Sequence, residues 1–301
     1  MTVANLRGRP APGWAALPPL AALLILATGV LPAGAERLAV LALVIGLGVP
    51  HGALDGEVAR PLLRPRWGRW WFGAFAVPYL ATAGAVLLAW RLAPEATLAG
   101  FLATSVWHFG SEDAPGRAWE ALVRGGLPIA APTLLQPHAT AEVLGVVAGV
   151  PLDGPPAWLL AAAWTWAVAV LAWVALGRPR RAVLLEGAAL LLAFAVLAPL
   201  TAFALYFVAL HAPRHMRELA SDRARAPRVS GMGSAALRSL PVLGLTLCLG
   251  ALLWPLYDGK PPDRLLALTL QGLAALTLPH MALDLLASRS ASQDPKPAGV
   301  P

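Results

Sequence analysis

The chain has 301 residues, of which 58% are apolar and only 13% are charged, and its mean hydropathy is +0.65. This small number of polar side chains could not cover a water-exposed surface. The composition therefore excludes a soluble globular protein and indicates an integral membrane protein. The net charge is +7, but the arginines lie in short breaks between apolar runs and form no basic groove interleaved with aromatic residues, which excludes a nucleic-acid partner.

The apolar runs predict an all-α fold, a polytopic transmembrane helical bundle that forms a single domain over residues 1–301. A spanning helix needs about 20 mainly apolar residues. Ten runs of uneven quality approach this length, at 16–31, 38–56, 71–90, 96–110, 118–135, 157–176, 182–197, 200–211, 235–257 and 265–286. The stretch 182–210 is either one long helix or two helices broken near Pro199. We therefore expect eight to ten spanning helices.

The two ends of the chain differ from this apolar body. Arg7 and Arg9 precede an apolar stretch at 20–31, a pattern that fits either a cleaved signal peptide or an uncleaved first helix. We favour the uncleaved helix, preceded by a cytoplasmic segment over 1–15. Polar residues and prolines near the other end predict a disordered tail over 287–301.

Basic residues indicate the orientation in the membrane. They are concentrated after the second, sixth and eighth runs: Arg60, Arg64, Arg66 and Arg69, then Arg178, Arg180 and Arg181, then five arginines from Arg214 to Arg228. Because cytoplasmic loops carry the excess of arginine, ten helices with both termini in the cytoplasm satisfy every loop. We expect a multi-pass protein of the cell (inner) membrane with a cytoplasmic N-terminus.

Five of the six histidines lie in four short motifs, each at the end of an even-numbered run. The motifs are PHGALD at 50–55, SVWHFGSED at 105–113, HAPRH at 211–215 and PHMALD at 279–284. Ionisable side chains at membrane depth are costly, so those that remain are usually functional. A single histidine at a helix end is more often a hydrogen-bonded interfacial residue. Four motifs at one depth instead favour a shared transition-metal site, with a proton relay as the alternative.

Spacing within the motifs predicts local geometry. His211 and His215 are four residues apart, so a continuous helix would aim both rings at one ion, although Pro213 between them can kink the turn.

Two carboxylates share this four-residue spacing. Asp55 follows His51, and Asp284 follows His280, by four residues. Each carboxylate would therefore lie on the face of its own histidine and accept the distal ring N–H. Direct ligation by the carboxylate is the alternative.

The remaining candidates are weaker. His138 follows an odd-numbered run, which places it on the opposite side of the membrane. Trp107 and Phe109 flank His108 and either pack in the bundle or line a substrate tunnel. Arg214 fits a loop or lipid-headgroup arginine better than a catalytic one.

Taken together in this order, the four motifs resemble the Brp/Blh family of membrane β-carotene 15,15′-dioxygenases, the retinal-forming enzymes associated with microbial rhodopsins. The resemblance runs from the second apolar run to the last. It implies a non-haem Fe2+ cofactor and no catalytic residue beyond the metal site. The implied ligands are His51, His108, His211 and His215, and the residues that support the site or serve as alternative ligands are His280, Asp55, Asp284 and Asp113.

The resemblance also implies a reaction. The iron site would use O2 to cleave β-carotene, dissolved in the lipid bilayer, at its central 15,15′ double bond and give two molecules of retinal, with a functional link to a rhodopsin. Two other classes stay open. A membrane di-iron hydroxylase or desaturase usually has more histidines in H-x-x-H-H clusters. A metal or proton transporter would place polar groups on both sides of the midplane, whereas here they are predicted on one.

Overall fold

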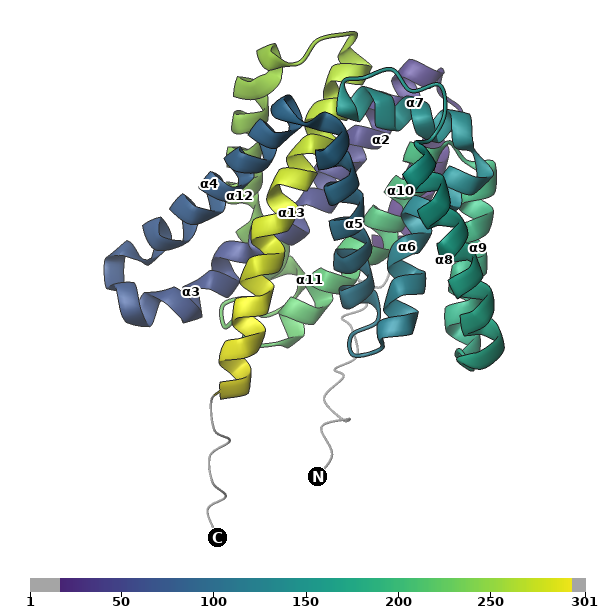
Figure 1. Ribbon diagram of the computed structural model, residues 1–301. Helices are drawn as coiled ribbons and strands as arrows, with labels where there is room; N and C mark the ends of the chain where they lie inside the picture. The colour runs from purple at the N-terminus through teal and green to yellow at the C-terminus, as the bar shows by residue number, and fades with distance from the viewer. Residues whose placement is uncertain (1–16, 294–301) are drawn as a thin grey trace.

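The computed structural model describes residues 17–293, and every secondary-structure element in that range is helical (Figure 1). The α-helices are α1 (Leu17–Thr28), α2 (Ala33–Leu43), α3 (Asp55–Trp67), α4 (Trp71–Leu92), α5 (Pro94–Asp113), α6 (Ala118–Leu135), α7 (Pro137–Ala148), α8 (Ala157–Leu176), α9 (Arg181–Val196), α10 (Pro199–Tyr206), α11 (Ala212–Ser221), α12 (Met232–Leu253) and α13 (Pro261–Gln293). Two π-helical turns, η3 (Val44–Gly48) and η6 (Phe207–His211), and three 3-10 turns, η4 (Val49–Leu54), η5 (Gly68–Trp70) and η7 (Trp254–Leu256), connect some of them.

The all-α membrane bundle predicted from the sequence is confirmed. Within residues 17–293, four stretches are long and apolar enough to cross a membrane: Ala33–Leu92, Ala157–Leu176, Met232–Leu256 and Pro261–Ser290. Large apolar side chains such as Leu171 on α8 and Leu252 on α12 are more than 70% exposed, as expected of helices that face lipid. The number of eight to ten spans stays a prediction.

Several boundaries differ from the predicted ones. The run at 38–56 is not one α-helix, because η3 and η4 interrupt it. The stretch 182–210 is broken before Pro199, which starts α10, since a proline fits the first turn of a helix but not its interior. Helix α7 was not predicted. The tail predicted as disordered over 287–301 is wrong for residues 287–293, where α13 continues its helical hydrogen bonding; residues 294–301 and the segment 1–15 lie outside the described residues.

Helix α13 runs through the middle of the bundle, with α5 and α4 beside it, while α6, α8 and α9 form one flank and α3 and α4 the other (Figure 1). Helix α5 packs against α6, α6 against α8, and α13 against α4. The main core includes Trp90, Phe109, Phe194 and Phe207.

Glycines bring α5 and α6 unusually close. A Cβ added at Gly125 of α6 would overlap the carbonyl oxygen of Val106 of α5, and one added at Gly110 would overlap the carbonyl oxygen of Ala121. Small residues at such crossings let helix backbones approach in membranes. This contact fixes the end of α5 that carries the second histidine motif.

Candidate metal centre

Two of the histidine motifs are built on irregular turns. A proline clashes with the carbonyl group four residues earlier in an α-helix. For Pro50 that carbonyl belongs to Gly46 in η3, and for Pro213 it belongs to Ala209 in η6, so each proline follows a π-helical turn that has lost the α-helical pattern. The chain therefore continues past Pro213 as a helix, and π-turns of this kind are frequent at functional sites.

Five buried histidines converge in the interior. The ring centroid of His51 lies 6.4 Å from that of His108, 5.6 Å from those of His211 and His215, and 5.8 Å from that of His280. Each of the five is at most 7% exposed. The structure thus brings together the four histidines named as ligands, and adds His280 to the same cluster.

Glu112 lies at the centre of this cluster. Its Oε1 is 3.2 Å from Nδ1 of His215, 3.5 Å from Nδ1 of His108 and 3.5 Å from Nε2 of His280, while its Oε2 is 3.4 Å from Nε2 of His211. Glu112 was not among the site residues predicted from the sequence. The signal was available, because Glu112 follows His108 by the same four residues that singled out Asp55 and Asp284.

Asp113, named as a supporting residue or alternative ligand, does not join the histidines. Among the described residues its polar partners are the Tyr206 hydroxyl, which donates to it at 3.0 Å, and the guanidinium groups of Arg214 at 3.4 Å and Arg124 at 4.0 Å. Arg214 also pairs with Glu186 and is not a free headgroup arginine. Successive helical residues point about 100° apart, so Glu112 faces the cluster and Asp113 links α5 to α11 instead.

The predicted pairing of Asp55 with His51 is wrong. Nδ1 of His51 donates to the carbonyl oxygen of Gly48 at 2.6 Å. Asp55 instead accepts from Nδ1 of His280 at 2.7 Å and from the Tyr79 hydroxyl at 2.7 Å. The 3-10 turn η4 between His51 and Asp55 does not keep α-helical spacing, so the two side chains do not lie above one another.

Asp284 lies at the edge of the cluster. Its Oδ2 is 3.9 Å from Nε2 of His280, and its Oδ1 accepts a hydrogen bond of 2.7 Å from Arg225. The structure therefore brings Asp284 near its own motif histidine, as its spacing predicted, with an arginine holding the other oxygen.

The donor atoms fit a transition metal. Three overlapping groups have their donor atoms within 4.8 Å of one another: His51, His108 and His280; His108, Glu112 and His211; and Glu112, His215, His280 and Asp284. Within the described chain, both ring nitrogens of His211, Nε2 of His215 and Oε2 of Glu112 are buried without a hydrogen-bond partner. Unpaired buried polar atoms are costly, and imidazole with carboxylate is a donor set that iron, zinc and copper accept.

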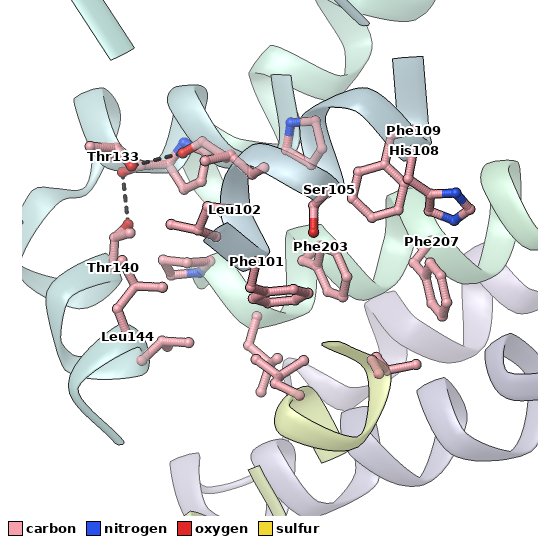
Figure 2. A pocket seen from close by; sticks show the side chains of 18 of the residues that line it. Phe101, Leu102, Ser105, His108, Phe109, Thr133, Thr140, Leu144, Phe203 and Phe207 are labelled. Carbon is pink, nitrogen blue, oxygen red and sulfur yellow. Dashed lines mark hydrogen bonds between the residues drawn. The ribbon is translucent and has the colours of Figure 1, made fainter. Parts of the chain in front are cut away.

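An apolar cavity of about 120 Å³ leads to this cluster (Figure 2). His108 and Phe207 lie at one end and Thr140 and Leu144 at the other, with Phe101, Leu102, Ser105 and Phe203 between them. Phe109 lines the cavity and also belongs to the main core. Trp107 is 57% exposed and does not line it, and His138 is exposed away from the cluster.

Fold and site together define an all-α membrane protein whose buried histidine–carboxylate cluster closes one end of an apolar cavity. The sequence profile of a family described as beta-carotene 15,15′-dioxygenase matches residues 42–286, which include all four histidine motifs. The chain therefore belongs to the β-carotene 15,15′-dioxygenase family, and the resemblance drawn from the motifs is confirmed.

Two relatives support this assignment. The chain is 30% identical to the "Probable beta-carotene 15,15′-dioxygenase Blh" of Halobacterium salinarum (strain NRC-1), over 90% of this chain and 89% of the relative. It is 26% identical to the "Beta-carotene 15,15′-dioxygenase" of uncultured marine bacterium 66A03, over 81% of this chain and 90% of the relative. No solved structure matches the chain.

Proposed function

We propose that the protein uses O2 and a non-haem Fe2+ ion to cleave β-carotene at its central 15,15′ double bond into two molecules of retinal. The observation that carries the proposal is the junction of the apolar cavity with the histidine cluster at His51 and His108, which both line the cavity. A long apolar substrate and a metal site would meet there. The relatives' names supply the substrate and the bond.

His51, His108, His211 and His215 are the proposed ligands, with His280 beside them. Iron bound by these residues would supply the activation of O2. The protein prepares the ligands by fixing their tautomers. Because Nδ1 of His51 donates to Gly48, and Nδ1 of His280 donates to Asp55, each of these rings in its neutral form keeps Nε2 free of a proton.

The cavity supplies the binding of the polyene. Phe203 and Phe207 are stacked with ring centroids 5.6 Å apart, and Phe109 lies edge-on to His211 at 4.8 Å. These rings line the approach to the histidines with flat apolar surface, which excludes water from the cluster and suits a planar conjugated chain.

At the far end of the cavity the polar side chains are already satisfied. The hydroxyl of Thr133 donates to the carbonyl oxygen of Ile129, and that of Thr140 donates to the carbonyl oxygen of Pro132. The end that would receive the substrate ring is therefore effectively apolar, as the β-carotene ring requires.

The proposal includes a location. The site would lie on the cytoplasmic side of the cell membrane, since the arginine-rich loops and the histidine motifs all follow even-numbered runs. Substrate would enter from the lipid, and retinal would be passed to a partner such as a microbial rhodopsin.

Expression in a carotenoid-accumulating host tests the function. We expect wild-type protein to deplete β-carotene and form retinal, His108→Ala to form none, and His138→Ala, the histidine outside the cluster, to behave as wild type. Retinal and shorter apocarotenals are separated by chromatography. Stable β-carotene with folded, iron-loaded protein would contradict the proposal, and apocarotenals other than retinal would contradict central cleavage.

A further inference from the structure

The cluster contains more donors than one oxygen-activating ion can use. Seven side chains contribute to the three overlapping donor groups: His51, His108, His211, His215, His280, Glu112 and Asp284. An octahedral ion has six positions, and an ion that activates O2 must leave at least one of them open. The surplus therefore has to serve another purpose, either as hydrogen-bonding support or as ligands of a second ion.

Three atoms that face one another point to a cation in this part of the cluster. Nδ1 of His280 donates its proton to Asp55, so in the neutral ring Nε2 is a lone-pair acceptor. This Nε2 faces Oε1 of Glu112 at 3.5 Å and Oδ2 of Asp284 at 3.9 Å, and both of these oxygens are acceptors as well. Three acceptors that face one another in a buried site require a cation among them, which is either a metal ion or a proton on Nε2.

The separations match those between ligands of one metal ion. With metal–ligand bonds of about 2.1 Å, neighbouring ligands lie about 3.0 Å apart and opposite ligands about 4.2 Å apart. The distances from Oε1 of Glu112 to His215 (3.2 Å) and His280 (3.5 Å), and from His280 to Asp284 (3.9 Å), fall between these limits.

The two oxygens of Glu112 face different histidines. Oε2 lies 3.4 Å from Nε2 of His211, whereas Oε1 lies 3.2 Å from His215 and 3.5 Å from both His108 and His280. A carboxylate with this orientation can bridge two ions, which in two-metal sites are about 3.5–4 Å apart.

We propose that the cluster binds two transition-metal ions bridged by Glu112. His51, His108 and His211 hold the first, next to the cavity, and His215, His280 and Asp284 hold the second. This assignment rests on the proposed function for the identity of the metal as iron. It moves His215 from the first ion to the second, and it adds a second position that the cleavage proposal does not need.

Residues outside the cluster orient the second position. Asp55, itself held by the Tyr79 hydroxyl, anchors Nδ1 of His280 and leaves Nε2 directed inward. Arg225 anchors Oδ1 of Asp284 and leaves Oδ2 for the ion. Partners of this kind fix the orientation of metal ligands and tune their basicity.

The test is the metal content of the purified full-length protein in detergent, stripped of metal and loaded anaerobically with ferrous iron. We expect two iron ions per folded chain, falling to one in Asp284→Asn and in His280→Ala, and unchanged in His138→Ala. Mössbauer spectra of the oxidised wild-type protein should show a spin-coupled pair. Saturation of folded wild-type protein at one iron per chain, with the spectrum of an isolated ion, would overturn the proposal, because a proton on His280 would then be the required cation.

This outcome is distinguishable from a failure of the proposed function. Retinal formation by protein that saturates at one iron would leave the cleavage reaction in place and remove the second position. Two coupled irons in protein that leaves β-carotene intact would support the second metal position and contradict the cleavage reaction.

Discussion

Helix α12 and the segment from α10 to α11 differ in regularity, in burial and in the way their sequences specify them. Helix α12 is 22 residues of unbroken α-helix, and its buried residues are Ala235 and Ser239. The α10–α11 segment passes through the π-turn η6 and buries both His211 and His215. A helix that faces lipid needs only apolar composition, whereas each position in the site segment is constrained by side chains from other elements. Substitutions should therefore have small effects in α12 and large effects around the histidines.

The largest contrast is expected between His211→Ala and Leu245→Ala. His211 is 1% exposed within the cluster, and its loss should remove the ion next to the cavity and abolish retinal formation. Leu245 of α12 is 58% exposed, so its truncation should change the free energy of unfolding by no more than about 0.5 kcal/mol. Iron content, retinal yield and thermal unfolding in detergent measure both. Equal losses in the two variants would contradict the expected difference between α12 and the histidine segment.

The helix crossing that supports the site gives the next largest effect. Gly125→Ala would drive a Cβ into the carbonyl oxygen of Val106, so α5 and α6 must separate, at a cost of about 1–3 kcal/mol or more. The shift would also displace Glu112. The matched control is Gly244→Ala in α12, where an added Cβ meets nothing within 4 Å and alanine should stabilise the helix slightly. Thermal unfolding and iron content compare the two variants, and an undisturbed Gly125→Ala protein would refute the close contact.

A smaller effect is expected for Asp55→Asn. The asparagine can still meet His280 but no longer carries the charge that favours donation from Nδ1, so metal affinity and activity should fall about 10–100-fold. Iron binding isotherms and initial rates measure this. If Asp55→Asn loses as much iron and activity as His51→Ala, Asp55 is a ligand and its role as a hydrogen-bond acceptor is wrong.

The smallest effect is expected for Tyr79→Phe. The substitution removes the hydrogen bond of 2.7 Å to Asp55, which itself contacts the cluster through His280, and should cost about 0.5–1.5 kcal/mol or a few-fold in rate. Because both variants act through His280, Tyr79→Phe combined with Asp55→Asn should be no worse than Asp55→Asn alone. Additive losses would mean that Tyr79 acts by another route.

The sequence could predict the features that depend on composition and on local spacing. Apolar runs predicted the all-α membrane bundle, and the order of the four motifs predicted the family. Pro199 marked where the chain could break before α10, although the sequence left one long helix open as the alternative. These signals are read along the chain, so no knowledge of the packing was needed.

Features that depend on packing were missed. Asp55 was assigned to His51, four residues away, but its partner is His280, 225 residues away and in α13. The 3-10 geometry of η4 that prevents the local pair has no clear mark in the sequence beyond Pro50. Glu112 and Asp113 are adjacent acids, and only the helical phase relative to His108 separates the one that enters the cluster from the one that pairs with arginines.

The central claim is that the buried histidine cluster binds the iron that cleaves β-carotene. Its most direct test is retinal formation by purified, metal-stripped protein as Fe2+ is added back, with Zn2+ as the redox-inactive control. We expect no retinal from metal-free or Zn2+-loaded protein. The retinal yield should rise with bound iron and reach a plateau when the cluster is filled. Retinal formation by metal-free protein, or by His211→Ala protein at the wild-type rate, would contradict it.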